Sequence, residues 1–287
     1  MKSVFINGEI LPIAGAKVSV FDRSYLYGEG AFESFRSYEG KLLFLERHLN
    51  RLRWSSEFLH LPFPEDTDFE KICVDLLEKN GFKEGRFKIV LSRYTEDEEN
   101  FETNLTIFCD KFDENDFPKN YKLKTIPNLC NDIPLLASIK STNRLPKVLG
   151  RLEALDSGFQ DGILLNGKGQ VTETTSGNLF WIDPNNVLKT VLKDCGILGG
   201  IMKDELIKLI HEKKLKVQEA IITPKELSNQ KEVFLTNSIV GIRPVVQIDD
   251  RQISGGEPGN VTLMLQSLWK KKIEGSVEKP WQPSNAP

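Results

Sequence analysis

The sequence is poor in the residues that build metal centres and disulfide frameworks. It has only four cysteines and three histidines in 287 residues, and no two cysteines form a C-x-x-C pair. This scarcity argues against a histidine-rich metal centre and against a zinc site. We therefore expect no metal, and we expect reduced thiols in a cytoplasmic protein.

Long apolar runs and an excess of positive charge are also missing. No run approaches the length of a bilayer-spanning helix, and the net charge is −3. Residues 1–8 contain three neighbouring apolar residues before a turn, so we expect no signal peptide. A small-molecule substrate is therefore expected, with no membrane and no nucleic acid as partner.

The chain length and the order of its patterns favour two domains. Short strands and amphipathic helices predict an α+β domain over residues 1–112. The polar, proline-bearing segment 113–120 is the expected linker, and a second domain is expected over residues 121–273. The proline-bearing tail 274–287 is expected to be disordered or loosely attached.

Within the first domain, Asn7-Gly8 predicts a hairpin, and Val18 and Val20 are expected to begin its second strand. Leucines from residue 45 to residue 59 follow a helical stripe, with Arg51 and two other arginines off that stripe. Such arginines usually form a solvated face, and at most one of them turns inward to bind an anion.

Lys140 is the first candidate for chemistry. It ends an apolar stretch and precedes a polar turn, and Pro146 is expected to open a helix. A lysine at such a place can be partly desolvated, which lowers its pKa and makes the amine a nucleophile for carbonyl groups. The alternative is an ordinary solvated surface charge, and this stretch alone favours that alternative.

Three further segments carry hydrogen-bond donors or an acidic side chain. A hairpin with its turn at residues 166–169 presents Glu173. Gly199-Gly200 precedes a predicted helix whose free N–H groups form an anion site, although a glycine pair alone favours a simple loop. A turn at residues 236–238 offers hydroxyl and amide donors. Together, these features suit a phosphorylated aromatic aldehyde cofactor.

In these motifs the chain resembles the class IV, or fold type IV, pyridoxal-phosphate enzymes. That family includes branched-chain aminotransferases, D-amino acid aminotransferases and 4-amino-4-deoxychorismate lyases. The resemblance extends to about Val246, and the motifs that carry it are Asp22-Arg23, Tyr27 to Phe32, His48 to Leu52, Ile139 to Ser141, Val171 to Phe180, Gly200 to Met202, and Asn237-Ser238.

The resemblance implies a D-amino acid aminotransferase-like fold with pyridoxal 5'-phosphate between the two domains, the second of which binds the cofactor. It implies that Lys140 is the catalytic Schiff-base lysine and proton shuttle, and that Glu173 pairs with the pyridine nitrogen. The other residues expected to bind the cofactor, mainly through its phosphate, are Arg51, Ile201, Met202, Asn237 and Ser238. It also implies a homodimer.

Within the family we expect a lyase that eliminates pyruvate from 4-amino-4-deoxychorismate and gives 4-aminobenzoate for folate synthesis. The segment Lys140-Ser-Thr-Asn-Arg-Leu145 resembles the lyase signature. Lys88 resembles a substrate-side lysine of the lyases, or is an exposed strand lysine, and Ser34 is a second substrate candidate. The acidic loop 93–102 departs from the pattern by which many members bind a substrate carboxylate.

Two alternatives stay open at this point. A branched-chain or D-amino acid aminotransferase is equally compatible with Lys140-Ser141. A non-catalytic binding protein on the same scaffold would not need both Lys140 and Glu173, so an enzyme is expected.

Overall fold

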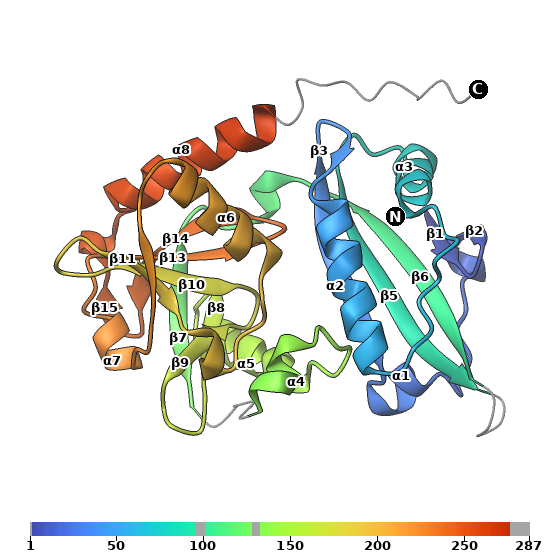
Figure 1. Ribbon diagram of the computed structural model, residues 1–287, viewed down its shortest axis with the longest axis horizontal. Helices are drawn as coiled ribbons and strands as arrows, with labels where there is room; N and C mark the ends of the chain where they lie inside the picture. Colours follow the sequence, from blue (N-terminus) through green and yellow to red (C-terminus); the bar gives the residue numbers. More distant parts are fainter. Residues whose placement is uncertain (1, 96–100, 128–132, 276–287) are drawn as a thin grey trace.

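A computed structural model describes residues 2–95, 101–127 and 133–275. Two β-sheets lie side by side, and each is flanked by helices (Figure 1). The expected α+β fold with two domains is thereby confirmed. The first sheet ends at Lys111 and the second begins at Tyr121, while the expected domain limits stay predictions.

Some expectations fall outside the described residues, namely those for Cys130, for the centre of the acidic loop and for most of the tail. Within the described part of the chain, no helix has the length and apolar character needed to cross a membrane. No cluster of three or more histidine, cysteine or acidic side chains suited to a metal ion occurs there either. A cytoplasmic location stays a prediction.

The first sheet has six strands in the order β2-β1-β6-β5-β3-β4. Its strands are β1 (Ser3–Ile6), β2 (Glu9–Pro12), β3 (Gly30–Tyr38), β4 (Lys41–Leu42), β5 (Gly85–Thr95) and β6 (Phe101–Lys111). Its helices are α1 (Arg23–Tyr27), α2 (Leu45–Phe58) and α3 (Phe69–Asn80), and α2 runs along the sheet beside β5 (Figure 1). Strand alternation sends Phe35, Phe87 and Ile107 to the helix-covered face, where they form a core with Leu52 and Leu76.

The expected strand at Val18 and Val20 is wrong. Both residues are exposed and lie outside the strands, whereas the second strand is β2. Asn7 and Gly8 both have positive φ, at 46° and 98°, so the chain reverses at once and Ile6 pairs with Glu9. The segment around Val18 instead leads into α1, whose first turn is capped by the Asp22 carboxylate.

The second sheet has nine strands in the order β12-β11-β10-β13-β14-β7-β8-β9, with β15 paired to β14. They are β7 (Tyr121–Ile126), β8 (Asp161–Leu165), β9 (Val171–Thr174), β10 (Asn178–Ile182), β11 (Leu188–Val191), β12 (Val217–Ala220), β13 (Glu232–Asn237), β14 (Gly241–Ile248) and β15 (Arg251–Gln252). The helices are α4 (Pro134–Ser138), α5 (Leu145–Asp156), α6 (Ile201–Glu212), α7 (Pro224–Leu227) and α8 (Asn260–Gly275).

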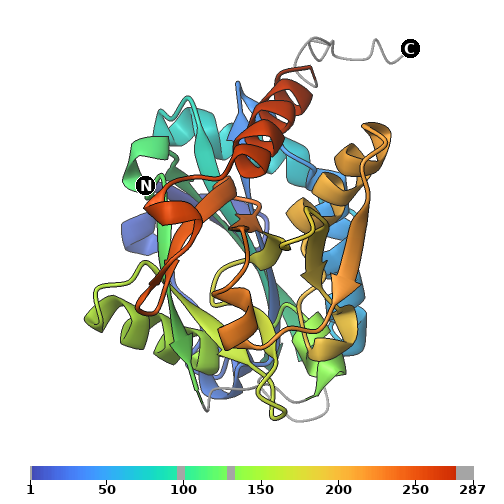
Figure 2. The same cartoon turned by 90° about the vertical axis from the view of Figure 1, so that its left-hand side faces the viewer.

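Helix α8 crosses above the second sheet (Figure 2), and its Leu265 and Trp269 pack with Phe234 of β13. An ion-pair group ties the two halves together. Arg47 of α2 contacts Asp204 at 3.0 Å and also pairs with Glu205, both in α6. These contacts fix the start of α6 against α2.

We expect Phe35→Ala to lower the free energy of unfolding by about 3–5 kcal/mol, because it empties a fully buried site. The Phe35 ring lies 5.2 Å from that of Phe87. Urea denaturation measures the change. Phe58→Ala, at an exposed site on α2, is the matched control and should cost far less. Equal losses in the two variants would contradict this assignment of the core.

Candidate active site

A cavity of about 430 Å³ opens where the two halves meet. Its wall contains residues from β3, α2 and α5, from the hairpin that ends in β9, and from the start of α6. The expected site residues in this wall are Ser34, Arg51, Lys140, Glu173, Ile201, Met202, Asn237 and Ser238. Residues far apart in the sequence are thus brought to one place.

The segment after Lys140 is docked on β3 by backbone hydrogen bonds across the junction. Phe32 N–H donates to the Lys140 carbonyl at 2.9 Å, and Thr142 N–H donates to the Gly30 carbonyl at 2.8 Å. The Thr142 hydroxyl lies 2.9 Å from the Gly28 carbonyl. The segment around Lys140 therefore behaves as a short extra strand, and its backbone position is fixed by the other half of the molecule.

The Lys140 amine is in an environment that favours its neutral form. Its Nζ lies 4.6 Å from the centroid of the Phe32 ring, over the ring face. Desolvation, helped by the Arg51 charge and against the pull of Glu33, lowers the pKa of Lys140 well below its ordinary value. A larger neutral fraction makes the amine a better nucleophile and a better base near neutral pH.

Glu33, His48 and Arg51 form a buried polar cluster beneath the cavity. The Glu33 carboxylate accepts from Arg51 Nε at 2.6 Å and from Arg51 Nη2 at 2.7 Å, and it lies 2.6 Å from His48 Nδ1. Burial acts to raise the pKa of Glu33, but Arg51 and His48 outweigh it and hold the value at about 2. Burial lowers the pKa of His48, so Arg51 supplies the charge opposite Glu33.

Arg51 keeps capacity for an anion in spite of these bonds. Its Nη1 donates to the Gly199 carbonyl at 2.6 Å, so three of its five N–H groups are occupied. The remaining two belong to a guanidinium whose orientation is already fixed by Glu33. A preset guanidinium loses less conformational entropy when it binds a phosphate oxygen.

The start of α6 lines the same cavity as Lys140. Gly200 is its N-cap and supplies no side-chain cap, so the first-turn N–H groups of Ile201 and Met202 are available to an anion. A Cβ on Gly200 would lie only 1.9 Å from Asn178 Oδ1, so this close approach requires glycine.

The turn after β13 completes this side of the cavity. Thr236 Oγ1 is buried and makes no hydrogen bond to any described residue, and Ser238 lies two residues further along in the same wall. The Asn237 side chain accepts from the N–H groups of Ile239 and Val240, so its oxygen shapes the turn. An unused hydroxyl beside free helix N–H groups and a guanidinium fits a phosphate.

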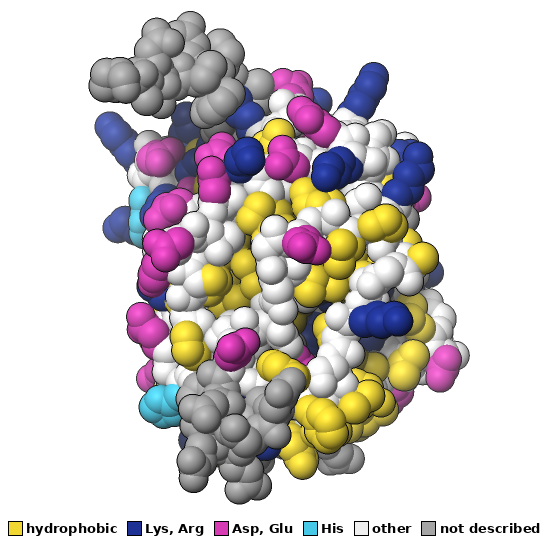
Figure 3. Space-filling model, turned by 90° about the vertical axis from the view of Figure 1, so that its right-hand side faces the viewer, with side chains coloured by type: hydrophobic (Ala, Val, Ile, Leu, Met, Phe, Trp, Pro, Cys, Tyr) yellow, Lys and Arg dark blue, Asp and Glu magenta, His cyan; other side chains and the backbone are white. Residues whose placement is uncertain are grey.

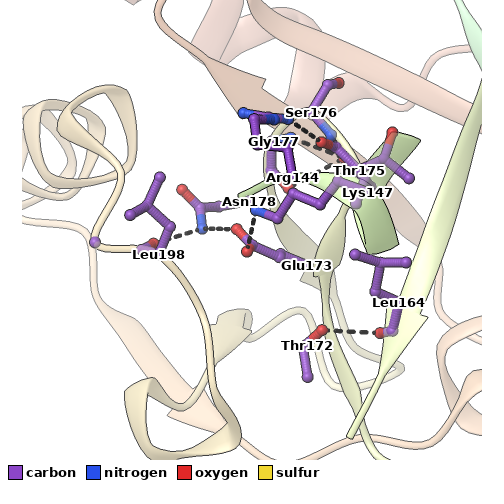
Figure 4. Close-up of polar contacts among 12 residues, drawn as sticks. Arg144, Lys147, Leu164, Thr172, Glu173, Thr175, Ser176, Gly177, Asn178 and Leu198 are labelled. Carbon is purple, nitrogen blue, oxygen red and sulfur yellow. Dashed lines mark hydrogen bonds and ion pairs between the residues drawn. The ribbon is translucent and has the colours of Figure 1, made fainter. Parts of the chain in front are cut away.

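Glu173 is buried on β9, at the end of the expected hairpin. Figure 4 shows its carboxylate between Lys147 and Asn178. Lys147 Nζ lies 2.6 Å from one carboxylate oxygen, and Asn178 Nδ2 lies 3.5 Å from the other. An ionised carboxylate accepts up to about four hydrogen bonds, so it retains room for a ring nitrogen.

The two substrate candidates differ in position. Ser34 lies in the cavity wall, whereas Lys88 is exposed on β5 and is absent from that wall. Lys88 Nζ is nevertheless 5.4 Å from the centroid of Phe32, and Arg144 Cζ is 5.1 Å from it. Three basic side chains, those of Lys88, Lys140 and Arg144, therefore lie near one buried aromatic ring.

The sequence patterns did not single out Glu33 or Lys147 as partners of Arg51 and Glu173. For Glu33 a signal was present, because it shares the buried face of β3 with Ala31 and Phe35. An acid at such a position requires a cation from the covering helix. For Lys147 no sequence signal distinguishes it from a solvated lysine.

The donors of this cavity suit a phosphorylated aldehyde cofactor. A family model described as "Amino-transferase class IV" matches residues 30–248, and the chain belongs to that family. The resemblance seen in the sequence is confirmed.

Relatives cover nearly the whole chain. A protein of Methanocaldococcus jannaschii named "Putative branched-chain-amino-acid aminotransferase" is 32% identical over 274 residues, covering 93% of this chain and 95% of that protein. The solved structure of a putative 4-amino-4-deoxychorismate lyase from Legionella pneumophila is 29% identical, with a TM-score of 0.81, and covers 90% of this chain and 96% of that one. The branched-chain aminotransferase of Thermoproteus uzoniensis has the same fold, with a TM-score of 0.86 at 24% identity, over 96% of each chain.

Enzymes of this class use pyridoxal 5'-phosphate. The residues of this cavity fit that group: Lys140 for the aldehyde, Glu173 for the ring nitrogen, and Arg51 with the start of α6 for the phosphate. These individual roles stay predictions.

We expect Glu33→Gln to destabilise the protein in a pH-dependent way. The pKa of Glu33 is about 2 in the folded protein against an ordinary 4.5, so its charge stabilises the fold above pH 4.5 and this contribution is lost as the pH falls toward 2. The loss in unfolding free energy should be about 3 kcal/mol at neutral pH and should shrink below pH 4.5.

Urea denaturation at a series of pH values measures this effect. Glu65→Gln removes an exposed partner of Arg53 and is the control, with little expected change. A loss for Glu33→Gln that is the same at pH 3 as at pH 7 would contradict the assignment.

Proposed function

We propose that the protein is a pyridoxal-phosphate-dependent aminotransferase. The observation that carries this proposal is the Lys140 amine, desolvated and held in the same cavity as Glu173 and the start of α6. The names of the relatives also support amino-group transfer, and they support it better than the lyase favoured in the sequence analysis. Family membership argues for an enzyme over a non-catalytic binding protein.

When bound, the cofactor supplies an aldehyde and an electron-withdrawing ring. With its lowered pKa, Lys140 Nζ would take a proton from the α-carbon of the substrate and later give that proton up. Glu173 supplies the negative charge that holds a proton at the ring nitrogen. Arg51 and the N–H groups of Ile201 and Met202 would hold the phosphate, and with it the position of the ring relative to Lys140 Nζ.

A second candidate, 4-amino-4-deoxychorismate lyase, is favoured by the cations in and beside the cavity. Arg144, Arg86 and Arg151 line the cavity and Lys88 lies next to it. An aliphatic side chain gains nothing from such cations, whereas a substrate with two carboxylates is bound by them. The same Lys140 Nζ would then manage the proton transfers as pyruvate leaves. The Legionella structure supports this alternative.

One assay separates the two reactions. Purified protein with pyridoxal phosphate is given either an amino acid plus 2-oxoglutarate, or 4-amino-4-deoxychorismate with no keto-acid acceptor. An aminotransferase forms glutamate in the first mixture and no pyruvate in the second, because transfer requires an acceptor. Branched-chain L-amino acids and D-alanine are the amino donors to compare.

The expected result is acceptor-dependent glutamate formation that Lys140→Ala abolishes. The loss should exceed about a hundredfold, because the proton-transfer group itself is removed. Pyruvate release without an acceptor would establish the lyase in place of the aminotransferase. If Lys140→Ala turned over substrate as fast as the unsubstituted protein, both candidates would be contradicted.

We also propose a homodimer. Figure 3 shows hydrophobic side chains gathered toward the centre and lower right of one face of the molecule. Independently of that view, α5 exposes five apolar residues along one chain segment: Leu145, Val148, Leu149, Leu152 and Leu155. Exposed apolar surface of this extent is typical of a protein–protein interface, and Val148 and Leu152 also line the cavity. A second copy covering α5 would therefore lie close to the active site.

We expect sedimentation velocity to give twice the mass of one chain. The double variant Leu149→Glu and Leu155→Glu should sediment as a monomer, because it places two charges in the proposed interface. Leu215→Glu, at an exposed site after α6, is the control and should remain dimeric. A monomeric unsubstituted protein would contradict the proposal.

A further inference from the structure

The carboxylate expected to meet the ring nitrogen already has a cationic partner. Glu173 is 5% exposed, and Lys147 Nζ lies 2.6 Å from its Oε1. Lys147 comes from the first turn of α5, directly after Pro146, and its side chain is about a quarter exposed, at 26%. Figure 4 shows the ammonium and Asn178 approaching the carboxylate from different directions.

This ion pair belongs to the active site. Lys147 and Glu173 both line the cavity of about 430 Å³ described above. Both also line a smaller cavity of about 90 Å³, whose wall includes Lys140 and Leu198. A ring nitrogen that reaches Glu173 therefore comes close to the Lys147 ammonium as well. The other charged side chains that line the cavity of about 430 Å³ are Arg51, Arg86, Lys140, Arg144 and Arg151.

The two effects of Lys147 on a ring proton oppose each other. The ammonium holds the buried carboxylate in place and ionised, which favours a proton on a ring nitrogen beside it. Its own positive charge near the ring nitrogen would disfavour that proton. Because Lys147 pairs with one oxygen of Glu173, the carboxylate would be shared between the Lys147 ammonium and a protonated ring nitrogen.

We propose that Lys147 is a positioning residue that orients Glu173 and reduces the proton occupancy of the cofactor's ring nitrogen. The ring proton determines how strongly the ring withdraws electrons, so Lys147 adjusts the reactivity of the cofactor through its ion pair with Glu173. This inference rests on the cofactor binding at this site, and it holds for the aminotransferase and for the lyase alike.

The test is a pH titration of holoenzyme that carries pyridoxal phosphate labelled with ¹⁵N in the ring, because the ¹⁵N chemical shift reports the ring proton directly. Lys147→Gln removes the charge but keeps an N–H donor for Glu173, and Lys147→Met removes both. In each variant the pKa of the ring nitrogen should rise by about 1 to 3 units relative to the unsubstituted enzyme. Lys147→Arg keeps the charge and should leave the titration unchanged.

A matched control comes from a second ion pair in the same half of the molecule. Lys189 and Asp183 lie 2.9 Å apart, their side chains are 26% and 9% exposed, and neither lines the two cavities. Lys189→Met should lower stability about as much as Lys147→Met and should leave the ring titration unchanged. Thermal unfolding of each variant measures its loss of stability.

The outcomes separate this inference from the proposed site. A bound ¹⁵N signal whose titration is the same in the unsubstituted enzyme, Lys147→Gln and Lys147→Met overturns the role of Lys147 and leaves the cofactor site intact. A shift in Lys189→Met as large as that in Lys147→Met also overturns it. Absence of any bound signal in the unsubstituted protein overturns the cofactor site and this inference together.

Discussion

The structure depends on the backbone pairing between β3 and the segment that follows Lys140. Two hydrogen bonds, from Phe32 N–H and from Thr142 N–H, fix a lysine of one half of the molecule against a strand of the other. Such bonds are short in range and strict in geometry, so the amine keeps its place only while the two halves stay docked. The same strand presents Phe32 to the cavity and Glu33 to the covering helix. Strand β3 thereby positions both the Lys140 segment and Arg51.

Charge burial explains both the stability of this junction and its chemistry. Isolated buried charges are costly, and here each is held by a partner: Glu33 by Arg51, and Glu173 by Lys147. Lys140 is different, because its surroundings are mainly cationic and aromatic, and its amine is driven toward the neutral form. Ion pairs thus hold the surrounding acids, while the Lys140 amine has a lowered pKa.

Much of the fold follows from local patterns. The leucine stripe predicted a helix at residues 45–59, and α2 runs from Leu45 to Phe58. The glycine-bearing turn correctly predicted the hairpin that presents Glu173, and Pro146 lies at the start of α5. The strand at Val18 failed because β-branched residues favour strands only where a partner strand is in register, and β2 had already paired with β1. The lysine beside Glu173 was unpredictable, because the meeting of α5 with β9 depends on the packing of the second sheet.

The central claim is that a single amine, that of Lys140, holds the cofactor covalently. Borohydride reduction of the holoenzyme converts such a linkage into a stable bond, and peptide mapping by mass spectrometry then locates the added mass. The account predicts one modified residue, Lys140, and no modification in Lys140→Ala. Label on Lys147, on another lysine, or on none would contradict it.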